Sequence, residues 1–292
     1  MRESIGLLGY GYTARYFAKL LNKARFNVFG TKRNLSIGNQ SNNEINLLEF
    51  THKNVLTILE QCSSFLISIA PDPNGIDPFL VEFKKTLLEH SSTIKWIGYL
   101  SSTGVYGNHE GKWVDEQSVS NHVNERNSNR LHVEQQWLAL FREYNIPVHV
   151  FRLASIYGPN RNVIEKILAG KDYSIVKKGQ YFSRVHVDDI AALLYQSLQH
   201  PTPGEIFNVC DDFPAPSDEV DRYAASILQM GELKLVDYKE AQLSPMARSF
   251  YDNNRRVSNQ KIKKQLSYQF QYPCYKLGLQ NILKQHEDKN NE

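Results

Sequence analysis

Residues 4–14 read SIGLLGYGYTA, and this stretch predicts the fold class. A short apolar strand runs into a glycine-rich turn, and a helix from residue 12 to 23 follows. In a G-x-G-x-x-G/A fingerprint the first glycine allows the tight turn, here Gly9, and the second lets backbone amides approach a pyrophosphate, here Gly11. Ala14 takes the third position, where a small side chain lets helix and strand pack closely. The pattern predicts a dinucleotide site on the positive end of the first helix, with Tyr12 and Thr13 in contact.

Short apolar runs alternate with longer amphipathic ones through the first 153 residues, which is typical of βαβ units and a parallel sheet. The expected strands are 4–8, 27–31, 45–47, 65–70, 95–100 and 148–153. The expected helices are 12–23, 55–61, 78–90 and 128–144. A loop is expected at 71–75 on turn chemistry, and another at the Asn/Ser-rich residues 34–43. We therefore predict an α/β fold with a Rossmann doubly wound parallel sheet.

Beyond residue 156 the alternation weakens and prolines break the chain into shorter elements. We predict a Rossmann domain over 1–158 and a smaller C-terminal substrate lobe over 159–292. Residues 184–210 are expected to return to the Rossmann sheet, with a strand at 206–209. Asp188 or Asp189 is expected to cap a helix running to Gln199, and no metal is assigned to this pair.

Composition excludes several classes of protein. The 292 residues are 41% hydrophobic and 22% charged, as in ordinary globular chains, and a net charge of +3 is too small for a whole-surface nucleic-acid field. The longest apolar runs have the length of a strand, so no membrane span is expected. The N-terminus lacks the pattern of a secretory leader, and the three cysteines form no CxxC pair, so we expect a cytoplasmic protein.

The end of the second strand bears on the choice of cofactor. An NAD site usually places an acidic residue there to hold the ribose hydroxyls, but no acidic residue occurs between Glu3 and Glu44. The chain reads Thr31-Lys32-Arg33 instead, and a guanidinium suits a 2′-phosphate. We expect NADP rather than NAD. The alternative is that Lys32 and Arg33 are solvated loop charges.

Three segments carry a family resemblance: 101–107 (SSTGVYG), 152–159 (RLASIYGP) and 184–190 (RVHVDDI). Together they resemble the NAD(P)-dependent epimerase/dehydratase branch of the extended short-chain dehydrogenase/reductase superfamily, over nearly the whole chain from Ile5 to about Leu279. Residues 244–251 and 255–259 are similar to a small bacterial subgroup described as nucleoside-diphosphate-sugar epimerases or reductases.

The resemblance implies a serine that hydrogen-bonds the reacting oxygen, here Ser102, a tyrosine acid/base, and a lysine on the next helical turn that lowers the tyrosine pKa. The chain departs from this pattern, because the tyrosine position falls on Arg126 and the lysine position on Arg130. Arginine does not deprotonate at neutral pH, so Arg126 is no general base, whereas Arg130 could still hold the cofactor ribose. Tyr106 and His186 are the alternative candidates for the acid/base role of the tyrosine, and the acid/base stays unassigned.

The expected catalytic group is Ser102, Thr103, Tyr106 and Arg130. Ala70, Ser101 and Leu153, at the ends of three predicted strands, complete the expected cofactor site with Arg130. The expected substrate contacts are Arg184, His186 and Arg248, whose cations suit a diphosphate. Other cations of the second lobe, Arg255 among them, have the plainer interpretation of solvated surface charges. Tyr157 is interpreted as a packing residue beside the cofactor.

We therefore expect an NAD(P)-dependent oxidoreductase or epimerase acting at a hydroxyl or carbonyl of a small polar, sugar-nucleotide-like substrate. The alternative is a non-catalytic NADP-binding sensor, which the missing tyrosine and lysine favour. The resemblance also implies a homodimer formed through the helices 78–90 and 128–144.

Overall fold

The structure is a computed structural model that describes residues 2–35, 45–121 and 125–290. Most of the loop expected at 34–43 therefore lies outside the described residues. The chain forms two compact units. The first comprises Met1–Ser102, Glu125–Arg152 and Ile190–Phe207, and the second Thr103–Asn124, Leu153–Asp189 and Asn208–Glu292. A cofactor domain over 1–158 with a substrate lobe over 159–292 stays a prediction.

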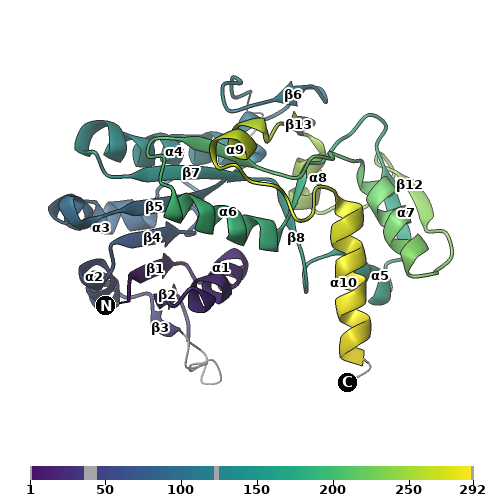
Figure 1. Ribbon diagram of the computed structural model, residues 1–292. Coiled ribbons are helices and arrows are strands. Elements are labelled where there is room, and N and C mark those ends of the chain that lie inside the picture. Colours follow the sequence, from purple (N-terminus) through teal and green to yellow (C-terminus); the bar gives the residue numbers. More distant parts are fainter. Residues whose placement is uncertain (1, 36–44, 122–124, 291–292) are drawn as a thin grey trace. The chain divides into compact units, whose positions relative to one another are not determined.

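A seven-stranded sheet organises the first unit, in the order β11-β7-β5-β4-β1-β2-β3. The pairings that join β3, β2, β1, β4 and β5 are parallel, and Figure 1 shows these strands stacked in that order. The strand bounds are β1 Ser4–Leu8, β2 Asn27–Lys32, β3 Asn46–Glu49, β4 Ser64–Ile67, β5 Trp96–Ser102, β7 Val148–Leu153 and β11 Ile206–Val209. The Rossmann-type α/β fold is confirmed.

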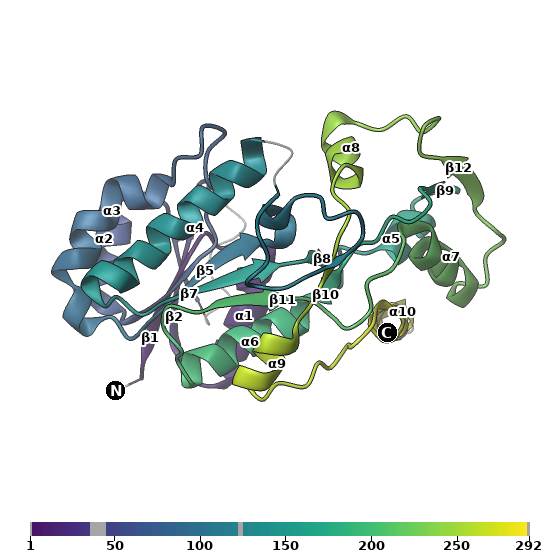
Figure 2. The same ribbon diagram turned by 90° about the horizontal axis from the view of Figure 1, so that it is seen from above.

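Helices cover both faces of this sheet, as Figures 1 and 2 show. One face carries α2 (His52–Gln61), α3 (Pro78–Glu89) and α4 (Glu125–Tyr144), and the other carries α1 (Tyr12–Lys23) and α6 (Val187–Gln199). On the second face Trp96 is fully buried, contacts the ring of Phe17 and donates its indole N–H to Ser197. Crossover helices on both faces are what a parallel sheet requires, since it must be buried on each side.

Two expected boundaries are wrong for local reasons. The strand expected at 65–70 ends at Ile67, because the Ser68 hydroxyl turns to the backbone carbonyl oxygen of Gly9. The helix expected at 55–61 begins earlier, at His52, because the Thr51 hydroxyl accepts a hydrogen bond from the Asn54 amide. In side-chain capping of this kind the hydroxyl oxygen accepts a hydrogen bond from one of the unpaired backbone amides at the start of a helix.

Among its described residues, the second unit contains three two-stranded parallel sheets. These pair β8 (Ser155–Tyr157) with β10 (Arg184–His186), β9 (Tyr173–Val176) with β12 (Lys234–Asp237), and β6 (Trp113–Val114) with β13 (Arg256–Val257). Its helices are α5 Val163–Leu168, α7 Ser217–Ile227, α8 Pro245–Tyr251, α9 Gln260–Gln265 and α10 Tyr275–Asn290. Residues of α5, α7 and α10 share one apolar core. Across the described ranges, no helix is long and apolar enough to cross a membrane.

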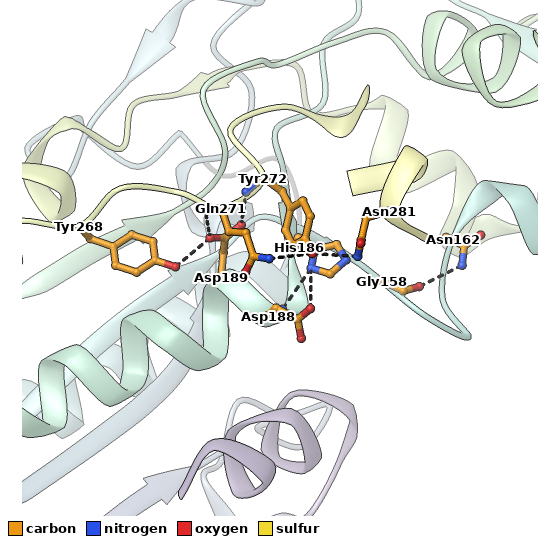
Figure 3. A network of polar contacts seen from close by, with 9 residues as sticks. All are labelled: Gly158, Asn162, His186, Asp188, Asp189, Tyr268, Gln271, Tyr272 and Asn281. Atoms are coloured by element: carbon orange, nitrogen blue, oxygen red, sulfur yellow. Dashed lines mark hydrogen bonds and ion pairs between the residues drawn. The ribbon is translucent and has the colours of Figure 1, made fainter. Parts of the chain in front are cut away.

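The expected cap on α6 is wrong. Asp188 and Asp189 both lie inside the first turn of the helix, which begins at Val187. The buried Asp189 carboxylate accepts hydrogen bonds from the Tyr268 hydroxyl at 2.8 Å, the Gln271 amide at 2.7 Å and the Tyr272 amide at 3.0 Å (Figure 3). Asp189 therefore anchors the segment 268–272, a distant partner that local sequence does not reveal.

Candidate cofactor and substrate sites

The turn between β1 and α1 requires glycine at its first position. Gly9 has a φ of +94°, a conformation that side chains disfavour, and a Cβ there would lie 2.8 Å from the Ser68 hydroxyl oxygen. The turn is held by the Thr31 strand, because the Gly9 amide donates to the Thr31 hydroxyl at 3.1 Å and the Tyr10 amide donates to the Thr31 carbonyl at 2.7 Å. The loop is thus locked to the neighbouring strand.

The second glycine leaves open space in front of α1. A Cβ on Gly11 would meet only the Gly9 carbonyl oxygen, at 4.0 Å. Gly11 is the N-cap residue, and within the described chain no side chain caps α1. The amides and partial positive charge of a helix N-terminus favour an anion. The small, buried Ala14 lies beneath, so the turn fits a dinucleotide pyrophosphate.

The end of β2 presents two cations. Thr31 is fully buried with its hydroxyl on the Gly9 amide, which assigns it to support of the loop rather than to direct phosphate contact. The Lys32 ammonium lies 5.8 Å from the centre of the Tyr10 ring, and Arg33 is exposed. Lys32 and Arg33 thus stand where an NAD site usually places a carboxylate.

A buried ionic network lies beside the end of β5, and sequence reasoning missed it. The fully buried Glu134 of α4 accepts hydrogen bonds from the Arg152 guanidinium, 2.7 Å from Nη2, and from the Ser101 hydroxyl. Ser101, expected in the cofactor site, thus turns its hydroxyl to α4. The sequence did contain a signal of this buried pair. Arg152 interrupts the apolar strand 148–153, and Glu134 lies among the apolar positions of the helix.

The residues expected at the family's tyrosine and lysine positions, Arg126 and Arg130, both lie on α4. Arg126 is exposed and Arg130 is partly buried. Burial raises the pKa of Tyr99, and the positive charge of Arg130 opposes this rise. Ser102 ends β5 in the same unit, and Ala70 is exposed beyond the end of β4. Arg130 therefore supplies a charge, but no proton acceptor, on this helix.

In the second unit Tyr106 and Thr103 belong to a 3-10 turn, Thr103–Tyr106, that follows β5. Both are buried, and the Tyr106 hydroxyl donates to the side-chain oxygen of Asn208 at 2.7 Å. A hydroxyl already held in this way is a poor substitute for a free acid/base. Leu153, at the end of β7, is buried as well.

His186 is enclosed by aromatic rings. Its ring centre lies 5.1 Å from that of Tyr157 and 4.1 Å from that of Tyr272, and no part of it is exposed. Nδ1 accepts a hydrogen bond from the Asp188 amide at 3.2 Å, whereas Nε2 has no partner among the described residues (Figure 3). Burial lowers the pKa of His186 to about 4, so the ring is neutral at pH 7 and cannot act as a general acid there.

Arg184 and Arg248 differ in their surroundings. Arg184 Nη1 donates to the carbonyl oxygens of Phe182 and Ala215, at 2.8 and 2.9 Å. Arg248 is exposed, and its guanidinium carbon lies 5.4 Å from the centre of the Tyr238 ring. Arg184 is thus committed to backbone carbonyls, while Arg248 keeps an exposed charge.

Comparison with known proteins gives the family. The sequence profile of the NAD dependent epimerase/dehydratase family matches residues 81–210, which include the segments after β5 and β7. A solved structure of a functionally unknown conserved protein from Silicibacter pomeroyi DSS is 38% identical, with 97% of this chain and 99% of that one covered and a TM-score of 0.89. The chain belongs to the NAD dependent epimerase/dehydratase family.

Two further proteins are similar to this chain over nearly its whole length. Protein YeeZ of Escherichia coli K12 is 25% identical over 93% of this chain and 97% of its own length. The dTDP-glucose 4,6-dehydratase of Bacillus anthracis, solved in complex with NAD, is 18% identical with 99% and 98% of the chains covered and a TM-score of 0.76. The latter likeness concerns the fold. Membership of the family supports a nicotinamide cofactor without distinguishing NAD from NADP.

Proposed function

We propose that this family member is an NAD(P)-dependent oxidoreductase or epimerase acting at a hydroxyl or carbonyl carbon of a small polar, sugar-nucleotide-like substrate. The observation that carries the proposal is the Gly9–Gly11 turn, which is locked to β2 and open in front of α1. A bound nicotinamide cofactor supplies hydride transfer. In our proposal Gly11, Tyr12 and Thr13 hold the pyrophosphate, Arg130 the ribose, and Ser102 the reacting oxygen.

NADP is the proposed form of the cofactor, because cations at Lys32 and Arg33 favour a 2′-phosphate through charge-assisted hydrogen bonds. The family's designation as NAD dependent points the other way. Titration of the purified protein with NADPH and with NADH decides between them, followed by nicotinamide fluorescence and thermal stability. Tighter binding of NADPH supports the proposal, tighter binding of NADH corrects the cofactor, and binding of neither refutes the function.

A non-catalytic, NADP-binding sensor is the second candidate, and the arginines at 126 and 130 favour it because neither replaces the tyrosine general base. A screen of nucleotide sugars and their keto derivatives, read by NADPH absorbance, separates the two. In an enzyme, Ser102→Ala lowers turnover and leaves cofactor affinity unchanged. A sensor gives no turnover with any substrate.

The expected substrate contacts are Arg184, His186 and Arg248, but His186 is fully buried and Arg184 donates to two backbone carbonyls. Of these, Arg248 keeps an exposed guanidinium, so it is the residue that we expect to meet a diphosphate directly. Arg248→Ala should weaken binding of a nucleotide sugar with no change in cofactor affinity.

A further inference from the structure

Two cations of this protein that are buried or partly buried are paired with carboxylates. Arg152 is paired with Glu134, and Lys171 is paired with Asp221. Such pairing is the rule, because an ionised group that leaves water without a partner raises the free energy of the folded state.

Arg255 departs from this rule. Its Nη1 donates to the Gly107 carbonyl oxygen at 3.0 Å, and its Nε is buried with no hydrogen-bond partner in the described part of the chain. Nor does any carboxylate of the described residues form an ion pair with it. Desolvation lowers the pKa of Arg255 to about 10, so the group is still charged at pH 7.

The backbone around Arg255 is firmly held. The Asn254 carbonyl oxygen accepts hydrogen bonds from the amides of His109, at 2.9 Å, and Gly111, at 3.0 Å. The preceding Asn253 carbonyl accepts one from the side chain of Gln180, at 3.0 Å. The guanidinium is therefore mounted on segments that the fold fixes, unlike a solvated surface cation.

Two further polar atoms on these segments lack partners. The side-chain oxygens of Gln180 and Asn253 are both buried without a hydrogen bond among the described residues. Orphaned buried polar atoms are rare and need an explanation. Donors such as hydroxyl groups would satisfy these two acceptors, while an acceptor with negative charge would satisfy the Arg255 Nε.

We propose that Arg255 binds an oxyanion of the substrate, a phosphate or a carboxylate group, through the Nε and Nη2 edge of its guanidinium. The Gly107 carbonyl holds Nη1 and so orients that edge, and a guanidinium edge matches two oxygens of one anion. This assignment rests on the proposed function, since Gly107 directly follows the turn that carries Thr103 and Tyr106.

Stability provides the first test. A cation kept for a ligand costs the free protein stability, whereas a cation kept for structure adds to it. Arg255→Met should leave the Tm of the free protein unchanged or raise it, and the matched variant Arg152→Met, which strands Glu134, should lower it strongly. A fall of similar size in both variants would overturn the proposal.

Binding provides the second test, with inorganic phosphate, UDP and glucuronate as probes in calorimetry. The wild-type protein should bind at least one of them, and Arg255→Gln should weaken that binding about tenfold or more. Arg255→Lys should recover part of the loss, and the surface control Arg222→Gln should have no effect. Phosphate-containing probes and glucuronate distinguish the two oxyanions.

Equal affinity in Arg255→Gln and the wild type, or binding of no probe, refutes the anion site. NADPH and NADH affinities are measured in the same variants. If the wild-type protein binds neither NADPH nor NADH, the proposed function is refuted. Anion binding that depends on Arg255 would still establish the anion site.

Discussion

At the scale of single residues, the two glycines of the first turn do different work. Gly9 is required by its backbone conformation and by the lack of room beside Ser68. Gly11 has an ordinary φ of −94° and open space at its Cβ position. The turn therefore requires glycine at the first position, whereas the second position has room for a Cβ atom and is the one that we propose faces the pyrophosphate.

Gly11→Ala should preserve the fold and abolish cofactor binding. Loss of stability should stay below about 1 kcal/mol, since glycine and alanine differ modestly at an N-cap and the new methyl group meets no atom closely. The same methyl group would occupy the space proposed for a pyrophosphate. Thermal unfolding measures the stability of the variant, and fluorescence titration measures its cofactor affinity. Cofactor affinity equal to that of the wild type would contradict the proposed pyrophosphate site.

Gly9→Ala is the matched variant, and unlike Gly11→Ala it should lower the stability of the fold, by about 1–3 kcal/mol, through backbone strain. Gly179→Ala, at a φ of +75° with no atom within 4 Å of the added carbon, isolates the strain from the clash. The difference between these two variants measures the contact with Ser68.

Arg33→Ala should reduce NADPH affinity about tenfold and leave NADH affinity unchanged. The reason is that a charge-assisted hydrogen bond to a 2′-phosphate is available only in NADPH. Parallel titrations with both cofactors measure the ratio, with Arg25→Ala as the control cation. An equal effect on both cofactors would show that Arg33 is a solvated charge.

At the scale of elements, buried polar side chains join segments that are distant in sequence. Glu134 of α4 bonds to Arg152 of β7 and to Ser101 of β5, and Asp77 at the start of α3 accepts from the Trp137 indole of α4 at 2.8 Å. These contacts fix α4 against the strand that ends in Ser102. The helix register, and with it the placement of Arg130, is set by burial of these groups.

Glu134→Gln should destabilise the protein by about 3 kcal/mol or more, because it removes the carboxylate charge that balances the buried Arg152 guanidinium. The double variant Glu134→Leu with Arg152→Met should regain much of this loss, since two apolar side chains need no partners. Denaturant unfolding of Glu134→Leu, Arg152→Met and the double variant gives the coupling energy. Additive losses would show that the two groups do not act as a pair.

At the scale of the whole molecule, burial lowers the pKa of a described histidine in each compact unit. In the first unit His149 Nδ1 donates to the Ile97 carbonyl at 3.3 Å, and Nε2 accepts from the Thr202 amide at 2.9 Å. Burial lowers the pKa of His149 to about 4. In the second unit burial lowers the pKa of His186 to about 4 as well.

Acid should therefore destabilise the protein between pH 6.5 and 4. A histidine whose folded pKa lies below its unfolded value of 6.5 adds stability above pH 6.5 and loses it as the pH falls toward 4, by about 3 kcal/mol for one such group. The effect of one histidine is isolated by comparing wild type with His149→Gln across this range. Parallel pH profiles would contradict the assignment.

Much of the fold was predictable because its signals are local. The strand–glycine–helix pattern at residues 4–23 and the apolar runs at β5 and β7 depend on neighbours in sequence, and the α/β architecture follows from their alternation. Boundaries were less predictable where a side chain interferes, as Ser68 does at the end of β4. The role of Asp189 was misjudged because its partners lie in a segment that is distant in sequence.

The sequence by itself determined the Rossmann-type sheet, the family and the glycine turn. Each of these is a matter of which residue type stands at a given position in the chain. The tertiary structure alone decided which charges are buried and what they face: Arg152 meets Glu134, whereas Arg255 has no carboxylate partner within the described residues. The free energy of a buried charge depends on the groups around it, and only folding brings those groups together.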